Sequence, residues 1–241
     1  MSQPGPLAPD LGQRDRSPLG GPRPGRLRRA VVAGAAALCL VGSLGGCGHA
    51  GGATAPSPTV NRTPQGLSAD RLVAALDRTE IDGHRLQASE LPGRAVVSLP
   101  AGVSASPAQC GSGIAGPEGT VQVSARVGDV GIAVVETPTV DQATTLLAAY
   151  HRRATTCRRY TLTAAGGRST VSAEKVPVGT NLLQPLALSL TTTTGSTVTR
   201  ATSLQGRTGA VIIAVTSATG STPLGDLVSI AHGVRDSVQR A

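Results

Sequence analysis

The sequence predicts an α+β fold in which a largely antiparallel sheet is flanked by helices. Short runs rich in Val, Ile and Thr follow one another through turn signals, which is typical of hairpins. Three amphipathic helical patterns lie before, between and after these runs, so helices and strands do not alternate as they do in a parallel fold. Aromatic residues make up only 1% of the 241 residues, so the core must be built from aliphatic side chains.

The first half of the predicted domain begins with a helix that Ser68 caps. Leu72, Val73 and Leu76 follow at helical spacing. A short strand is predicted over 95–99. Apolar residues then alternate over 120–127, turn at Gly128-Asp129 and continue as an apolar run over 131–137, which indicates a hairpin.

The second half begins with the strongest helical pattern, from Val140 to Tyr150 or beyond, whose apolar face reaches Cys157. Four strands are predicted next: 169–176, 186–192, 197–204 and 210–216. Tight turns at 193–196 and 206–209 make the last three an antiparallel meander. A final helix is predicted from Ser221-Thr222-Pro223, with Pro at an early helical position.

The N-terminal segment 1–46 has the pattern of an export signal. Residues 1–29 are rich in Pro, Gly and Arg and are expected to be a disordered basic n-region. An uncharged apolar h-region follows over 30–44 and is shorter than the roughly 20 residues of a spanning helix. Arg28-Arg29 leaves twin-arginine export open beside general secretion.

The end of that segment, Leu44-Gly45-Gly46-Cys47, resembles the bacterial lipobox. The resemblance implies cleavage before Cys47, attachment of a diacylglycerol to its sulfur and acylation with chains such as palmitate. Such chains contribute about 0.8 kcal/mol for each buried CH₂ and anchor a protein to a membrane. The predicted location is therefore the extracytoplasmic face of the cell membrane. Residues 47–66 are then the lipidated cysteine and a flexible tether, and 67–241 a single extracytoplasmic domain.

Two cysteines, Cys110 and Cys157, remain in the predicted mature domain. Cys39 lies in the predicted signal and Cys47 is the predicted lipid site. An even pair in an oxidising compartment most simply forms a disulfide. We therefore predict a Cys110–Cys157 bond.

The net charge is +8, but part of it comes from the basic N-terminal segment. With almost no aromatic platforms, nucleic-acid binding is not expected. Neither a metal nor a cofactor is expected, because the histidines (His49, His84, His151 and His232) stand apart and the GxGxxG match at 111–116 lacks a preceding strand. One basic cluster, Arg152, Arg153, Arg158 and Arg159, is either a solvated helix end or a docking patch for an anionic partner.

Several segments together resemble the actinobacterial cell-envelope lipoproteins that carry a PknH-like extracellular sensor domain. They are the early helix before the Pro/Gly stretch (72–93), Ser106-Pro107-Ala108-Gln109-Cys110, Thr155-Thr156-Cys157 and the strand at 209–216 with its closing helix. The resemblance implies a sheet flanked by helices, with a cleft for an unidentified ligand. This chain has one candidate disulfide where the naming member of the family has two.

We therefore expect a membrane-anchored, non-enzymatic lipoprotein that binds an unidentified small ligand or an envelope protein or polymer. Two alternatives remain open. One is an envelope hydrolase with dispersed acidic residues, and the other is a lipid carrier with an apolar cavity. Facing carboxylates across a polar cleft would favour the hydrolase, and a large apolar cavity would favour the carrier.

Overall fold

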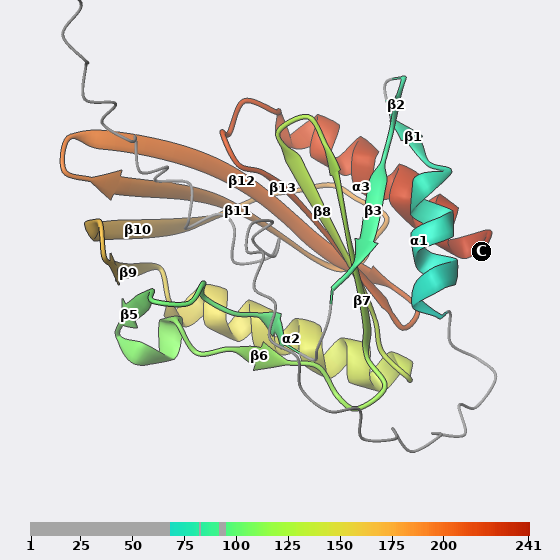
Figure 1. Ribbon diagram of the computed structural model, residues 1–241, viewed down its shortest axis with the longest axis horizontal. Coiled ribbons are helices and arrows are strands. Elements are labelled where there is room, and N and C mark those ends of the chain that lie inside the picture. Colours follow the sequence, from blue (N-terminus) through green and yellow to red (C-terminus); the bar gives the residue numbers. More distant parts are fainter. Residues whose placement is uncertain (1–67, 82, 92–94) are drawn as a thin grey trace, which may run out of the picture. The chain divides into compact units, whose positions relative to one another are not determined.

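The computed structural model describes residues 68–81, 83–91 and 95–241. The predicted signal, lipobox and tether lie outside these residues. In the described part no helix is long and apolar enough to cross a membrane. Within these residues there are three α-helices and a nine-stranded sheet (Figure 1), and every strand pair is antiparallel, which confirms the predicted fold class.

The helices are α1 (Ala69–Asp77), α2 (Val140–Thr156) and α3 (Leu224–Gln239), with a short 3₁₀ turn at Ala108–Cys110. The large sheet has the order β3-β7-β8-β13-β12-β11-β10-β9-β5. Its strands are β3 (Gln87–Glu90), β5 (Ser104–Ser106), β7 (Val121–Val127), β8 (Val130–Glu136), β9 (Arg159–Ala164), β10 (Gly167–Val176), β11 (Leu183–Thr194), β12 (Thr197–Thr208) and β13 (Val211–Ser217). Two small pairs complete the fold: β1 (Glu80–Ile81) with β2 (His84–Arg85), and β4 (Ala95–Val97) with β6 (Ile114–Ala115).

The helix starts follow from local side-chain chemistry. The Ser68 hydroxyl accepts a hydrogen bond from the Arg71 backbone N–H, as the sequence predicts. At α2, Thr139 and Gln142 form a capping box, each side chain bonded to the other's backbone. The last helix is present as predicted, but Pro223 is its N-cap and not an early helical residue, so α3 begins at Leu224.

The sheet is covered on both faces at its centre. Helices α1 and α3 pack on one face around Leu72, Val134 and Ile213, and α2 packs on the other around Val135 and Ile212. Alternate residues of β8 and β13 therefore enter opposite cores, and all seven residues of each strand are buried. This explains why both strands have nearly continuous apolar sequences instead of an alternating pattern.

One predicted turn is wrong. Residues 206–208 do not turn but continue β12, and the chain reverses only after Thr208, through Gly209 at φ +56°. Gly206 lies inside the strand. The position requires glycine because a Cβ atom there would come within 2.6 Å of the Leu182 Cβ atom. Its role is close packing rather than a turn conformation.

A network of hydroxyl groups joins the β7–β8 turn to the connection between β13 and α3. The Asp129 carboxylate accepts hydrogen bonds from Ser217 (2.8 Å), Thr219 (2.5 Å), Ser221 (3.0 Å) and Thr222 (3.1 Å). Burial by itself would raise the pKa of Asp129, but the four hydrogen bonds outweigh it and lower that pKa to about 2.

This network predicts a specific acid response. Because the folded pKa lies below the ordinary value of 3.8, ionised Asp129 stabilises the fold above that pH and the contribution is lost as the pH falls towards 2. Asp129→Asn should therefore lower the melting temperature at pH 6 and flatten its decline between about pH 4 and pH 2. Calorimetric scans across this range measure both effects. Glu118→Gln, at an exposed turn, is the matched control, and an equal flattening there would contradict the assignment.

Candidate functional site

The predicted disulfide is present between Cys110 and Cys157. Their Cα atoms are 5.6 Å apart, and both residues are buried. Cys110 ends the 3₁₀ turn and Cys157 caps the C-terminus of α2. The bond thus holds the segment around residues 97–111 against the end of α2.

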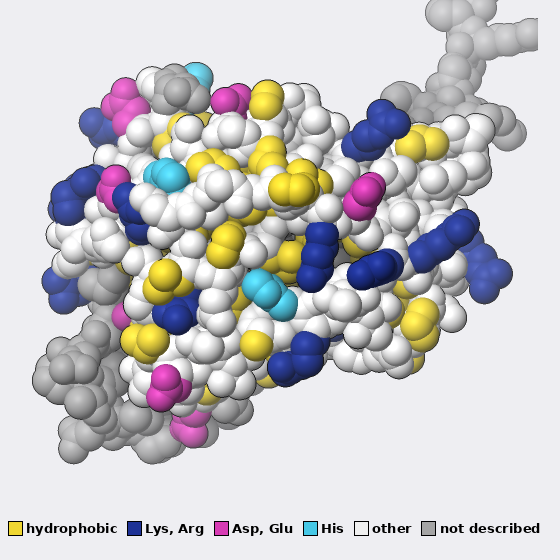
Figure 2. Space-filling view, turned by 180° about the vertical axis from the view of Figure 1, so that it is seen from behind, with side chains coloured by type: hydrophobic (Ala, Val, Ile, Leu, Met, Phe, Trp, Pro, Cys, Tyr) yellow, Lys and Arg dark blue, Asp and Glu magenta, His cyan; other side chains and the backbone are white. Residues whose placement is uncertain are grey.

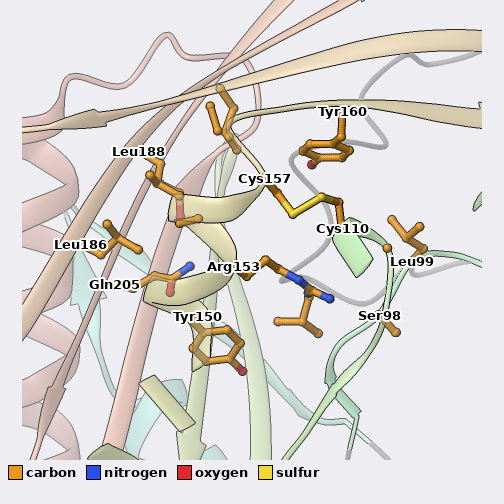
Figure 3. A pocket seen from close by; sticks show the side chains of 16 residues that line it. Ser98, Leu99, Cys110, Tyr150, Arg153, Cys157, Tyr160, Leu186, Leu188 and Gln205 are labelled. Atoms are coloured by element: carbon orange, nitrogen blue, oxygen red, sulfur yellow. A yellow bond between two sulfur atoms is a disulfide. The ribbon is translucent and has the colours of Figure 1, made fainter. Parts of the chain in front are cut away.

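A largely apolar cavity of about 110 Å³ lies beside this disulfide. Three walls enclose it (Figure 3): the sheet strands β10–β12, the inner face of α2 and the segment near Ser98 and Leu99. The lining residues are Val97, Ser98, Leu99, Cys110, Gly111, Tyr150, Arg153, Ala154, Cys157, Tyr160, Ala173, Leu186, Leu188, Leu190, Ser203 and Gln205. Leu186, Leu188 and Leu190 are alternate residues of β11, so the pleat of one strand turns all three to the cavity.

Two polar groups in this lining have no partner within the described part of the chain. They are the Tyr150 hydroxyl and the Gln205 side-chain carbonyl oxygen. Tyr150 is only 5% exposed and Gln205 only 6%. Most buried polar groups in proteins have a hydrogen-bond partner, and leaving one unpaired costs about 1–3 kcal/mol. Two such unpaired groups therefore lie on one cavity.

The chemistry of the two groups is complementary. Burial raises the pKa of the Tyr150 phenol well above its ordinary value, and the nearby charge of Arg153 opposes this only in part. The phenol is therefore neutral at physiological pH and is available as a hydrogen-bond donor. The Gln205 carbonyl oxygen is an acceptor. These two unpaired groups thus offer one donor and one acceptor.

Arg153 adds a positive charge to the lining. Its guanidinium extends from α2 towards the wall that carries Ser98 and Leu99 (Figure 3), and the side chain is half-buried. Among the described residues, the one ion pair joins Arg235 to Asp236 and does not involve Arg153. Arg153 has no carboxylate partner there.

A second hollow of about 250 Å³ adjoins the cavity and shares Ala154 and Ala173 with it. Its other lining residues are Arg158, Glu174 and Lys175, two positive charges and one negative. On the face shown in Figure 2, Lys and Arg side chains gather beside a hollow with apolar side chains. The basic residues that line the adjoining hollow are Arg158 and Lys175.

The structure divides the four arginines of the predicted docking patch. Arg153 is half-buried and lines the cavity, whereas the other three are exposed to solvent. Of these three, Arg158 lines the adjoining hollow. The predicted lipidation site Cys47 and its lipobox residues Leu44, Gly45 and Gly46 lie outside the described residues.

The histidines that the structure describes stand in different places. His84 is exposed, and His232 bonds the Thr180 hydroxyl through Nε2 at 2.9 Å. Burial lowers the pKa of His151, and the charge of Lys175 lowers it further. No group of three or more metal-ligating side chains occurs among the residues that the structure describes. At the start of the GxGxxG match, a Cβ atom on Gly111 would come within 2.6 Å of the Leu99 Cδ1 atom, so this glycine allows tight packing beside the disulfide.

Sequence reasoning missed the polar residues Tyr150 and Gln205 as site residues. Tyr150 falls on the apolar face of a helix, where a core role is the more common one. One signal was available, since the chain has two tyrosines and no other aromatic residue, and both of them line this cavity.

The chain is similar to known proteins in three-dimensional structure and not detectably in sequence. No family model matches the chain, and no curated protein matches it. The extracellular domain of PknH from Mycobacterium tuberculosis superposes with a TM-score of 0.47 at 14% identity, covering 73% of this chain and 93% of that one. An uncharacterised protein from Mycobacterium smegmatis gives 0.40 at 15% identity, covering 70% and 96%.

Proposed function

We propose that this protein is a membrane-anchored extracytoplasmic lipoprotein whose domain binds a small ligand in the cavity beside α2, as a sensor does. The observation that carries the ligand-binding part is the pair of buried polar groups on Tyr150 and Gln205, which have no partner among the described residues and line an apolar cavity. Pockets with a few convergent polar groups in an apolar lining are typical of small-molecule sites.

The compartment and the anchor rest on separate features. The Cys110–Cys157 disulfide supports an oxidising environment outside the cytoplasm. The segment Leu44-Gly45-Gly46-Cys47 supports lipidation at Cys47. Together they favour a domain held at the outer face of the cell membrane by lipid and a tether.

A separate hollow of about 680 Å³ has Asp129 and Asp226 in its lining, but the cavity beside α2 supports neither alternative. Its described lining includes neither Asp nor Glu, whereas a glycosidase-like hydrolase needs a pair of carboxylates across the bond to be cleaved. A carrier of whole lipids needs considerably more room than about 110 Å³, since even drug-sized ligands occupy pockets of about 300–1,000 Å³. A small ligand bound for recognition fits this space better.

One experiment tests the ligand site, and a second tests the lipid anchor. Native mass spectrometry of the full-length protein from its own host should detect a small bound molecule, and Tyr150→Phe should lose it without loss of thermal stability, because the phenol makes no internal hydrogen bond. Unliganded wild-type protein, or a Tyr150→Phe variant that retains the molecule at wild-type occupancy, would contradict the ligand site.

The anchor is tested independently by Cys47→Ala. We expect this variant to be uncleaved or soluble and to lack the acyl mass. Recovery in the membrane fraction, cleaved at the same site and as hydrophobic as the wild type in detergent partitioning, would contradict lipidation but leave the ligand site unaffected.

A further inference from the structure

We propose that the cavity binds an amphiphilic oxyanion, with a short apolar body among the leucines and an acidic headgroup at Arg153. This inference rests on the proposed ligand site and names the class of molecule that the site takes. It depends on the size of the cavity, the position of its polar groups and the sign of the charge around it.

The size and lining define the apolar body. A cavity of about 150 Å³ lined by aliphatic and aromatic side chains holds one benzene ring, and this cavity measures about 110 Å³. The part of the ligand that this cavity encloses therefore has no more than about six non-hydrogen atoms. Leu186, Leu188 and Leu190 form the wall that it contacts, and burial of apolar surface there favours binding.

The charge of Arg153 defines the headgroup. Among the described residues Arg153 has no carboxylate partner, although it is half-buried beside apolar side chains. Partly burying a cation without a counter-ion is unfavourable, and an anion with two oxygens matches the planar guanidinium fork. An arginine that only offsets the negative C-terminal end of the helix dipole can be exposed to solvent, as Arg152 on the same turn is. The helix dipole therefore does not explain why Arg153 is half-buried.

Three of the remaining groups agree with an oxyanion, whereas the Gln205 carbonyl oxygen, itself an acceptor, is left for a donor elsewhere on the ligand. The neutral Tyr150 phenol lies on the same helix one turn before Arg153 and can donate to an oxygen of the headgroup. Arg158 and Lys175 line the adjoining hollow and exceed the single negative charge of Glu174 there. A cationic ligand would meet this excess of positive charge, and a neutral one would leave Arg153 without a counter-ion.

A matched series of six-carbon probes tests the class. Hexanoate and hexyl phosphate carry an oxyanion, whereas hexan-1-ol and hexylamine carry a neutral and a cationic group on the same chain. We expect at least one oxyanion to bind the full-length protein tenfold or more tightly than either control, in NMR titrations at low salt. Which oxyanion binds more tightly distinguishes a carboxylate ligand from a phosphate ligand.

Variants locate the headgroup. Arg153→Gln should weaken binding of the preferred oxyanion at least tenfold and change the affinity for hexan-1-ol by no more than about twofold. Arg153→Lys keeps the positive charge and should retain most of the preference for an oxyanion over hexan-1-ol. Arg152→Gln is the matched control and should change neither affinity. If hexan-1-ol binds as tightly as the oxyanions, the headgroup inference is overturned while the ligand site stands. If none of the four probes binds, this ligand class is overturned, and native mass spectrometry separately decides whether the cavity holds any ligand.

Discussion

Cys157→Ser should lower the melting temperature of the protein by about 8–16 °C. The disulfide closes a loop with a sequence separation of 47 residues, and a loop of that length corresponds to roughly 4 kcal/mol in the chain-entropy model. A domain of this size loses about 2–4 °C for each kcal/mol. Loss of the bond also frees the segment near residue 110, so the cavity should lose ligand together with stability.

Calorimetry of the single and double variants tests this expectation. Cys110→Ser should have the same effect as Cys157→Ser, and the double variant should cost no more than either, because all three remove one crosslink. Reducing agent should lower the melting temperature of the wild type to that of the variants and leave the variants unchanged. Additive losses in the double variant would mean that the two cysteines stabilise the fold independently of a bond.

Leu227→Ala should destabilise the protein by about 3–5 kcal/mol, or about 6–20 °C in melting temperature. Leu227 lies on α3, is completely buried and belongs to the core between the sheet and helices α1 and α3. That core is entirely aliphatic, and a truncated leucine leaves a space that no neighbouring ring can fill. Urea titration with a fitted slope measures the change in unfolding free energy.

Leu183→Ala is the matched control, because the same truncation occurs at a side chain that is 52% exposed. It should change the unfolding free energy by no more than about 0.5 kcal/mol. Equal effects at the two positions would show that burial in this core is not what stabilises α3 against the sheet.

The sequence predicts the regular parts of the fold because their patterns are local. Helices α1, α2 and α3 each have a capping or Pro signal followed by apolar residues at helical spacing, and the Gly128-Asp129 turn identifies the β7–β8 hairpin. Short strands are different. Strands such as β5 and β6 have three and two residues and exist because distant strands pair with them, so no local pattern identifies them. β9 was also missed, although it forms a hairpin with the next strand, β10, through the turn at 165–166.

The site was less predictable than the fold because it depends on contacts across the sheet. Gln205 faces the cavity only because β12 continues through Gly206, where the sequence suggested a turn. Arg153 and Arg152 are neighbours in sequence, and only the packing of α2 decides which one lines the cavity. In contrast, the Cys110–Cys157 pairing could be predicted because two thiols in an oxidising compartment leave few choices.

The placement of the tyrosines has a spectroscopic consequence. The chain contains no Trp and no Phe, so its ultraviolet absorption near 280 nm and its intrinsic fluorescence come from Tyr150 and Tyr160. Both rings and the Cys110–Cys157 bond line the same cavity. The near-ultraviolet circular dichroism of the folded protein therefore reports on this cavity rather than on the fold as a whole, and an optical titration without any added label follows events at the site directly.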